Sequence, residues 1–147
     1  MPDDRTAVVA LWRGVFGYDE ARNDPERVLG ERVRFDSVNP QAGGVLVAVA
    51  NGQLIGTLMY GYDGHRGWLY RLAVAPERRR HGVGRALLSE AECRLRQLGC
   101  AKINLQVHSH NTAAAAFWMA VGYGQEARVS LGKDLTGEHP PGTDAGC

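Results

Sequence analysis

The feature that most constrains the fold is Asn51-Gly52, a dipeptide that stands between two apolar runs, Val45–Ala50 and Leu54–Tyr62. Asn-Gly favours a type I′ turn, whose twist matches that of two antiparallel strands. A second tight turn, Asp63–Gly67, leads into a third run, Trp68–Val74. The middle of the chain is therefore predicted to be an antiparallel meander of three strands.

Helical patterns precede this meander. Residues 3–16 are predicted to form a first helix, because apolar side chains recur there at helical spacing: Ala7, Val8, Leu11, Trp12 and Val15. Asn23 or Asp24 followed by Pro25 is typical of a helix start, since a capping side chain comes before a residue that needs no amide hydrogen. We predict a second helix to about Phe35 and a loop over Ser37–Gly44.

The periodicity changes again after Pro76. One face of a long helix is marked by Val83, Leu87, Ala91, Leu95 and Leu98, and Gly99 is placed to end it. Beyond it we predict a strand at Ile103–Val107, a helix from Asn111 through Val121, and a last strand at about Arg128–Leu135. Residues 1–135 are predicted to form one mixed α/β domain, and residues 136–147, rich in Gly and Pro, a disordered tail.

Composition excludes several classes of protein. The chain has 147 residues, 44% of them hydrophobic, and a net charge of only +1, so no global field points to nucleic acid or to a membrane surface. The apolar runs are far shorter than the roughly 20 residues of a membrane-spanning helix. Met1–Arg5 lacks the features of a secretory signal, and three scattered cysteines fit neither a metal site nor a disulfide framework. We expect a cytoplasmic protein with no metal, nucleic-acid or membrane partner.

Basic residues concentrate in one place, the segment Arg78–Arg85 between the third strand and the long helix. It holds four arginines and two glycines in eight residues. The glycines allow backbone amides to approach a bound anion, the helix adds the positive end of its dipole, and the arginines add charge-assisted hydrogen bonds. The pattern favours a phosphate-containing ligand over its alternative, an exposed basic turn that caps a helix.

The spacing within this segment fits neither a Walker loop nor a dinucleotide fingerprint, since there is no Lys-Ser/Thr pair and no third glycine. Arg79-x-x-Gly82-x-Gly84 instead resembles the R/Q-x-x-G-x-G/A signature of the GCN5-related N-acetyltransferases (GNAT). A second block of that family is similar to Asn111, Ala114, Phe117, Trp118, Gly122 and Tyr123. Within the family the chain resembles most the YpeA type, through Gly61–Gly67, Asn23–Pro25 and Ser130–Lys133.

The resemblance implies the GNAT fold, a mostly antiparallel central sheet with one splayed strand pair and about four flanking helices. It implies an N-acetyltransferase that moves an acetyl group from acetyl-CoA to a primary amine of a small molecule or protein, by direct attack in a ternary complex. The alternative is a non-catalytic module of the same fold that binds or senses acyl-CoA. The cofactor-binding residues implied are Leu72, Ala73, Val74, Arg79, Arg80, His81, Gly82, Val83, Gly84, Arg85, Asn111, Phe117 and Trp118.

Two positions depart from the family pattern. Trp118 stands where many members have a tyrosine that protonates the leaving sulfur, and Gln106 stands where the ribosomal-protein acetyltransferases have a glutamate. We therefore look nearby for the acid and base. Imidazole is a common general base in enzymes, so His65 is the best candidate base by chemistry, with Asp63 in the same turn.

Tyr70 is the candidate acid or substrate-orienting hydroxyl. The two-residue period of a strand places it on the same face as Trp68 and Leu72. The alternative for Asp63–Gly67 is a plain hairpin turn, with glycines where positive φ is needed.

A final departure concerns the start of the chain. Family members begin with a strand, whereas here the sequence starts inside the turn that follows it, so the first family strand is expected to be missing. The Val45–Ala50 strand would then be an unpaired edge, covered by a second subunit in a homodimer or left short. The alternative is that the chosen start codon is late.

Overall fold

The structure, a computed structural model, describes residues 2–17 and 23–136, with side chains from Asp4 onward. The chain divides into two compact units, Met1–His110 and Asn111–Cys147. The single domain predicted over residues 1–135 spans both units and stays a prediction. Apart from Thr136, the predicted tail lies outside the described residues.

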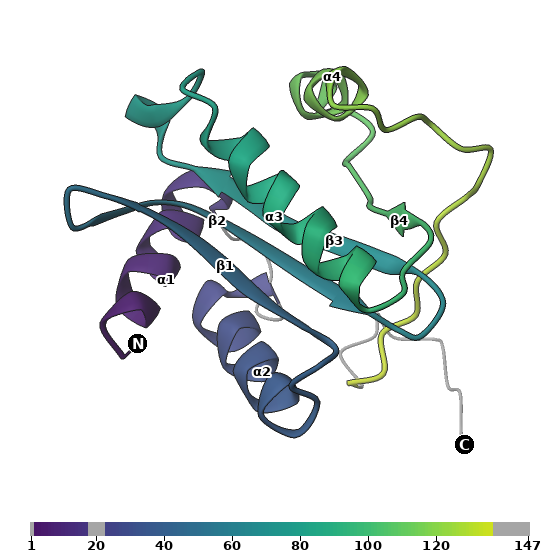
Figure 1. Ribbon diagram of the computed structural model, residues 1–147, viewed down its shortest axis with the longest axis horizontal. Coiled ribbons are helices and arrows are strands. Elements are labelled where there is room, and N and C mark those ends of the chain that lie inside the picture. Colours follow the sequence, from purple (N-terminus) through teal and green to yellow (C-terminus); the bar gives the residue numbers. More distant parts are fainter. Residues whose placement is uncertain (1, 18–22, 137–147) are drawn as a thin grey trace. The chain divides into compact units, whose positions relative to one another are not determined.

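The first unit is built on a four-stranded mixed sheet (Figure 1). Its strands are β1 Gly43–Ala50, β2 Gln53–Tyr62, β3 Gly67–Val74 and β4 Ile103–Asn104. They lie in the order β1-β2-β3-β4, with the first three antiparallel and β4 parallel to β3. Asn51 and Gly52 have φ of 51° and 75°, and a type I′ turn requires such positive values at both central residues. The predicted hairpin is therefore confirmed.

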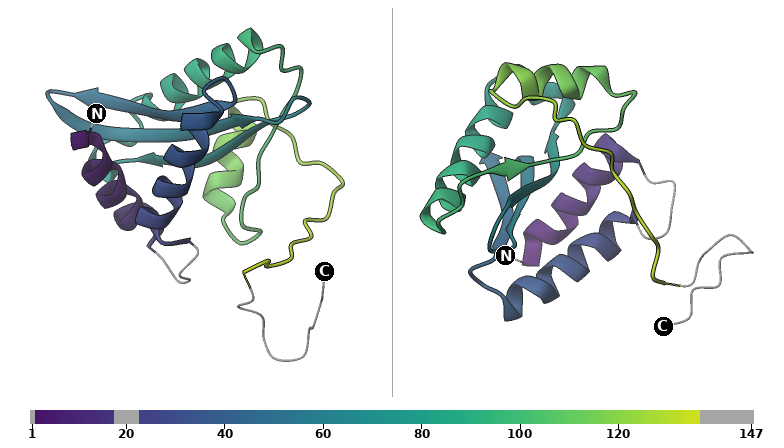
Figure 2. Two further views of the ribbon diagram at one scale, coloured as in Figure 1. Left: turned by 90° about the horizontal axis from the view of Figure 1, so that it is seen from below. Right: turned by 90° about the vertical axis from the view of Figure 1, so that its right-hand side faces the viewer.

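Helices cover both faces of this sheet (Figure 2). Helices α1, Pro2–Phe16, and α2, Pro25–Val38, lie on one face, and α3, Val83–Gln97, lies on the other. Under α1 and α2 a core cluster is buried that consists of Val8, Val9, Trp12, Leu29 and Ala73. Helix α3 buries Leu87, Leu88, Ala91 and Leu95. The mixed α/β architecture expected from the sequence is thus confirmed.

The second helix is longer than predicted. It runs to Val38, so the first residues of the predicted Ser37–Gly44 loop are helical. The last two residues of that predicted loop belong to β1. The reason lies at Asn39, whose backbone N–H and side-chain amide both donate to the Phe35 carbonyl at 3.0 Å. These bonds satisfy a carbonyl of the last turn and move the helix end past Phe35.

The second unit contains helix α4, Thr112–Ala120. Asn111 caps it as predicted, its side-chain oxygen accepting from the Ala114 N–H at 3.1 Å. The strand predicted at Arg128–Leu135 is wrong, because the structure has no strand there. A strand requires a hydrogen-bonded neighbour, and the described residues give this segment none; Val129 and Leu131 are 85% and 91% exposed.

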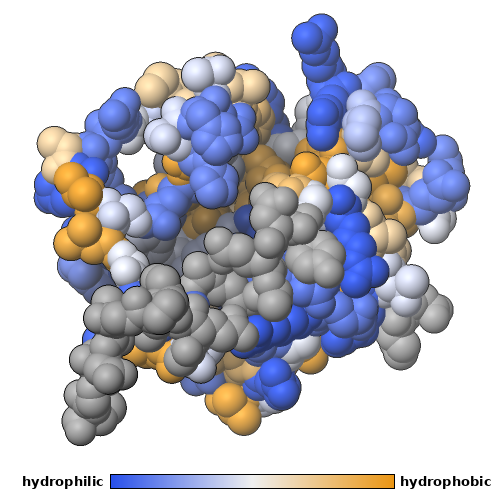
Figure 3. Space-filling model, turned by 180° about the vertical axis from the view of Figure 1, so that it is seen from behind, coloured by the Kyte–Doolittle hydropathy of each residue, from blue (hydrophilic) through white to orange (hydrophobic). Residues whose placement is uncertain are grey.

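Hydrophobic side chains are scattered over one face of the molecule. On this face, seen in Figure 3, they alternate with hydrophilic side chains, as is usual for protein surfaces. Across the parts of the chain that the structure describes, no helix is long and apolar enough to cross a membrane.

Candidate functional site

Strand β3 contains a bulge at its centre. Thr57 of β2 pairs with Ala73 and Met59 pairs with Tyr70, so β3 uses three steps where β2 uses two. Arg71, inside the bulge, has a φ of 49°, which is rare for a residue with a side chain. The ladder is therefore interrupted beside Leu72, at the point where the resemblance places cofactor contacts.

The bulge changes which side chains share a face of β3. Arg71 stacks its guanidinium on the rings of Trp12 and Phe16, at 5.1 and 5.5 Å from their centroids, and Ala73 is buried in the same α1–α2 core. Leu72, next to Ala73 in a regular strand, therefore points to the opposite face. The prediction that Leu72 shares a face with Trp68 and Tyr70 is wrong because the extra residue breaks the two-residue period.

A buried hydrogen bond supports the bulge from the side of the sheet that α1 covers. The Trp12 indole N–H donates to the Thr57 hydroxyl at 2.8 Å, and both residues are fully buried. That hydroxyl in turn donates to the Arg71 carbonyl at 3.5 Å. A polar chain thus connects α1 through β2 to the distorted backbone of β3. Neither Thr57 nor Arg71 was singled out from the sequence, because a bulge between distant strands has no local motif.

Beyond the bulge, β3 and β4 separate. Their pairing is limited to Gly67↔Ile103 and Trp68↔Asn104, and the predicted strand Ile103–Val107 ends at Asn104. From Leu69 to Val74, β3 therefore has a strand neighbour on only one side among the described residues. This is the splayed strand pair that the resemblance implies. The Ala73 side chain is buried in the core and is not available to a ligand. An added chain would therefore pair with the backbone groups of Leu72–Val74.

The basic segment, Arg78–Arg85, includes the N-terminus of α3. A short 3-10 turn, Pro76–Arg78, leads through exposed Arg79, Arg80 and His81 to Gly82, which precedes the first helical residue. Gly82 has a φ of 79°, where a glycine is favoured, and no side chain caps the helix. The amides of the first turn are thus left to an external acceptor, with positive dipole and arginine charge beside them.

Gly56 of β2 sets how closely this end of α3 approaches the sheet. A Cβ at Gly56 would lie 2.9 Å from Val83 Cγ1 and 3.1 Å from Leu87 Cδ1. The missing side chain lets the first turns of α3 rest on β2. The N-terminal end of α3, where anion binding is predicted, and the open side of β3 thereby belong to one sheet.

The turn between β2 and β3 is organised by Asp63. One carboxylate oxygen accepts from the backbone N–H groups of His65 and Arg66 at 2.8 and 2.7 Å, and the other accepts from the Trp68 indole at 3.3 Å. The two backbone hydrogen bonds are the main reason that the pKa of Asp63 is lowered from its ordinary value. Asp63 is therefore a weak base, and its oxygens are occupied in fixing the turn that presents exposed His65.

Tyr70 is partly accessible on the α1–α2 side, with 43% of the residue exposed. Burial of the rest raises the pKa of its phenol above the ordinary value, opposed by the nearby charge of Arg32. At neutral pH the hydroxyl is therefore protonated and able to donate. Gln106, in the segment after β4, is exposed.

In the second unit, Trp118 belongs to an aromatic cluster. Its ring meets those of Phe117 and Tyr123 edge-on, each with centroids 5.2 Å apart. The family-like block of residues 111–123 thus forms a capped helix with an aromatic cluster at its end. Within the described residues, no group of three or more His, Cys, Asp or Glu is placed to hold a metal ion.

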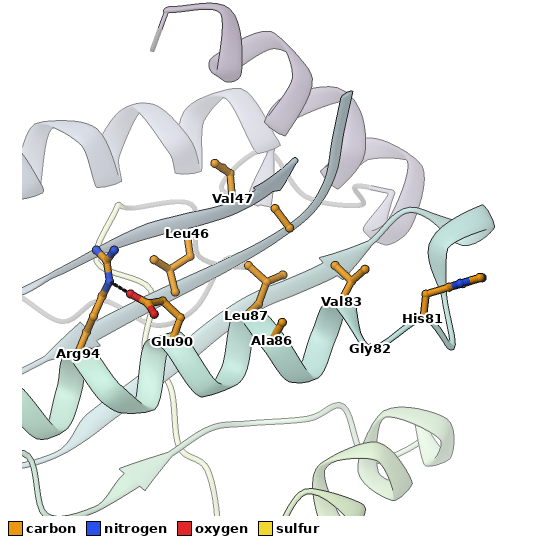
Figure 4. Close-up of a pocket in the computed structure, with 10 residues that line it drawn as sticks. Leu46, Val47, His81, Gly82, Val83, Ala86, Leu87, Glu90 and Arg94 are labelled. Carbon is orange, nitrogen blue, oxygen red and sulfur yellow. Dashed lines mark hydrogen bonds and ion pairs between the residues drawn. The ribbon is translucent and has the colours of Figure 1, made fainter. Parts of the chain in front are cut away.

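The structure also has a groove, which runs along α3 on the side of β1 (Figure 4). Its volume is about 440 Å³, and it is lined by Leu46, Val47, Ala48, His81, Gly82, Val83, Ala86, Leu87, Glu90 and Arg94. An ion pair between Glu90 and Arg94, at 2.8 Å, lies at one end of the groove, and His81 and Gly82 lie at the other. Since β1 and β4 are opposite edges of the sheet, this groove is distinct from the opening between β3 and β4.

Comparisons with known proteins agree with this geometry. Residues 7–123 match the family model described as "Acetyltransferase (GNAT) family". A curated relative, Acetyltransferase ECA0875 of Pectobacterium atrosepticum, is 38% identical over 135 residues, which cover 90% of each chain.

Solved structures share the fold. AAC(6')-Iy, in complex with the bisubstrate analogue CoA-S-monomethyl-acetylneamine, superposes with a TM-score of 0.72 at 18% identity and covers 90% of this chain and 92% of its own. The PaiA N-acetyltransferase of Thermoplasma acidophilum, in complex with coenzyme A, gives a TM-score of 0.69 at 23% identity, covering 87% and 86%.

Proposed function

Since the chain belongs to the GNAT family of acetyltransferases, we propose that it transfers an acetyl group from acetyl-CoA to the primary amine of a small molecule. A protein amino group is the second acceptor class. The observation that carries the proposal is the N-terminus of α3, which has no side-chain cap and is preceded by arginines, packed on the same sheet as the open side of β3.

The residues present fit coenzyme A. Amides of the Arg79–Gly84 segment would hold the pyrophosphate, with Arg79, Arg80 and Arg85 supplying charge. The backbone of Leu72–Val74 would pair with the pantetheine arm as an added strand does. Phe117, Trp118 and Asn111 are proposed cofactor contacts on the strength of the family motif alone.

Bound acetyl-CoA would supply the thioester that the amine attacks. The chain must provide three things: a site that accepts the proton of the ammonium, a donor for the developing oxyanion, and a proton for the leaving thiolate. We assign the first to His65, which is exposed on a turn fixed by Asp63. The bulge beside Leu72 offers a backbone N–H for the second, and the protonated phenol of Tyr70 is assigned to the third or to orienting the acceptor.

The small-molecule acceptor is favoured by one observation on a relative, the aminoglycoside-derived bisubstrate analogue bound to AAC(6')-Iy. The competing function, a non-catalytic acyl-CoA sensor, is favoured by Trp118 and Gln106. Neither an indole N–H nor a side-chain amide ionises near neutral pH, so neither can serve as the catalytic acid or base. Both functions require cofactor binding, and only the enzyme requires turnover.

Calorimetric titration with coenzyme A and acetyl-CoA tests the shared part. Arg79→Ala combined with Gly82→Ala should abolish binding, while the matched pair Arg96→Ala with Gly14→Ala should leave it unchanged. Arg96 lies in the last turn of α3, and Gly14 has nothing within 4 Å of an added Cβ. Retained binding by the first pair would refute the phosphate assignment.

Thiol release from acetyl-CoA with a panel of aminoglycosides, polyamines and peptides tests the chemistry. Release with one class of amine supports the enzyme; binding without release from any amine supports the sensor. His65→Ala should lower the rate at saturating amine without changing cofactor affinity. An unaltered rate would remove His65 from the mechanism.

A further inference from the structure

Arg71, the residue inside the bulge of β3, has a side chain that contacts both helices on this face of the sheet. Its guanidinium lies 5.1 Å from the ring centroid of Trp12 and 5.5 Å from that of Phe16, the last residue of α1. Its Nη2 donates to the backbone carbonyl of Asn23 at 3.3 Å, just before α2 begins at Pro25. A single side chain therefore connects the bulge to the end of α1 and to the start of α2.

The backbone of Arg71 has a conformation that suits a glycine better than an arginine. Its φ of 49° lies in the left-handed region, which is unfavourable for a residue with a Cβ. Such a conformation persists where the surrounding contacts determine it. Trp12 supplies two of these contacts: its ring lies against the guanidinium, and its indole N–H donates to Thr57, whose hydroxyl donates to the Arg71 carbonyl. Both the side chain and the backbone of Arg71 are thus held from α1.

The charge of Arg71 strengthens these contacts. Burial lowers the pKa of the guanidinium from its ordinary value, yet an arginine stays protonated in proteins. A partly desolvated cation is attracted to an aromatic ring more strongly than an exposed one. Among the described residues, Arg71 makes no ion pair with a carboxylate, so the two rings and the Asn23 carbonyl are the groups that orient it.

The bulge is also the part of β3 to which the proposed function assigns the backbone N–H for the developing oxyanion. Tyr70, assigned to the thiolate or to the acceptor, lies next to Arg71 and is 43% exposed; Phe16 is 44% exposed. We propose that Arg71 is a positioning residue that fixes the backbone of the bulge against the facing ends of α1 and α2, and so sets where that N–H lies. The effect on the rate rests on the proposed function, whereas the effect on the backbone rests on the contacts of Arg71 alone.

Arg71→Asn tests the effect on the rate, because asparagine tolerates the left-handed backbone but has no guanidinium. We expect kcat at saturating amine to fall at least about tenfold, since small displacements of groups at the reacting centre cost this much or more. Affinity for coenzyme A should change less than about twofold, because the Arg71 side chain contacts α1, on the face of the sheet opposite to α3 (Figure 2). If circular dichroism shows that this variant is unfolded, Arg71→Gly repeats the test with a residue that also suits the backbone.

Arg13→Asn is the matched control. Arg13 also connects the two helices, through a 3.4 Å ion pair with Asp24, but its side chain has no hydrogen bond to β3 among the described residues. This variant should keep its kcat within about twofold. An equal loss of kcat in this variant would overturn the proposal, because any loosening of the two helices would then have the same effect. A normal kcat in a folded Arg71 variant would overturn it as well.

Hydrogen exchange gives a readout that does not depend on turnover. The Tyr70 and Ala73 amides belong to the ladder pairs on either side of the bulge. In Arg71→Asn both should exchange at least about tenfold faster than in Arg13→Asn, while the amides of β1, which does not pair with β3, should change little. Unchanged exchange at the two amides, or an equal increase throughout the sheet, would overturn the positioning role. A wild-type protein that releases no thiol with any amine would refute the proposed function instead, and the exchange result would then decide by itself whether Arg71 fixes the bulge.

Discussion

Replacing Thr57 by Val should destabilise the protein by removing one buried acceptor. The Trp12 indole N–H lies 2.8 Å from the Thr57 hydroxyl, and both residues are 0% exposed, so water cannot replace the lost partner. Leaving a buried donor unsatisfied costs about 1–3 kcal/mol. Burying the new methyl group is more favourable than burying a hydroxyl, which offsets part of that cost. We therefore expect a net loss of about 1–2 kcal/mol in the free energy of unfolding.

Urea unfolding measures this loss as a lower midpoint at unchanged slope. A double-mutant cycle with Trp12→Phe isolates the hydrogen bond, because the phenyl ring has no N–H to strand. In the Trp12→Phe background, Thr57→Val should cost less than about 0.5 kcal/mol, and the coupling should account for the remainder. Thr6→Val, at an exposed position of α1, is the matched control.

A small cost in the wild-type background would refute the reasoning, and so would equal costs in both backgrounds. The first outcome would mean that the indole finds another acceptor. The second would mean that the hydroxyl acts through its 3.5 Å contact with the Arg71 carbonyl instead. Either result would change the account of what holds the β3 bulge.

Three further changes probe the site. Gly56→Ala places a Cβ 2.9 Å from Val83 and 3.1 Å from Leu87; we expect about 1–3 kcal/mol of destabilisation from overpacking and weaker acetyl-CoA binding, and normal values in both urea and calorimetric assays would contradict it. Gly82→Ala meets no neighbour within 4 Å, so its cost should be backbone strain alone, about 1–2 kcal/mol, and Gly82→Asn should cost less because asparagine tolerates this conformation; equal losses in urea would count against that explanation. Tyr70→Phe should remove from the 295 nm titration a component with a midpoint above 10, since burial raises this pKa. Because the pKa of Tyr70 is raised, its contribution to stability is present below pH 10 and is lost as the pH rises further. The wild type should therefore lose more stability than the variant in alkali. If the component that the variant lacks has its midpoint below pH 10, the assignment is contradicted.

Local signals in the sequence predicted the elements that depend on local chemistry. The Asn51-Gly52 turn, the capped start of α2 at Pro25 and the helix that follows Gly82 all lie where the sequence placed them. Each depends on the backbone preference of a glycine, a proline or a capping side chain, and such preferences act over a few residues. The glycine that precedes α3 was predictable for the same reason, whereas anion binding by this segment stays a prediction.

Features that arise from strand pairing were not predictable in this way. The bulge around Arg71 depends on the register of β2 against β3, and the early end of β4 at Asn104 depends on how far β3 diverges from it. The residues 128–135 alternate well enough to predict a strand, yet the described structure provides no neighbour to pair with them. Alternation states which face a side chain prefers, and only an adjacent backbone makes a strand.

By itself, therefore, the sequence determined the family, the hairpin and the start of α3, because these are encoded in consecutive residues with fixed spacing. The tertiary structure alone decided that Leu72 faces away from Tyr70 and that Trp12 and Thr57 support the bulge of β3. Those properties depend on hydrogen bonds and contacts between residues far apart in the chain, and no short motif records which backbone a given strand will meet.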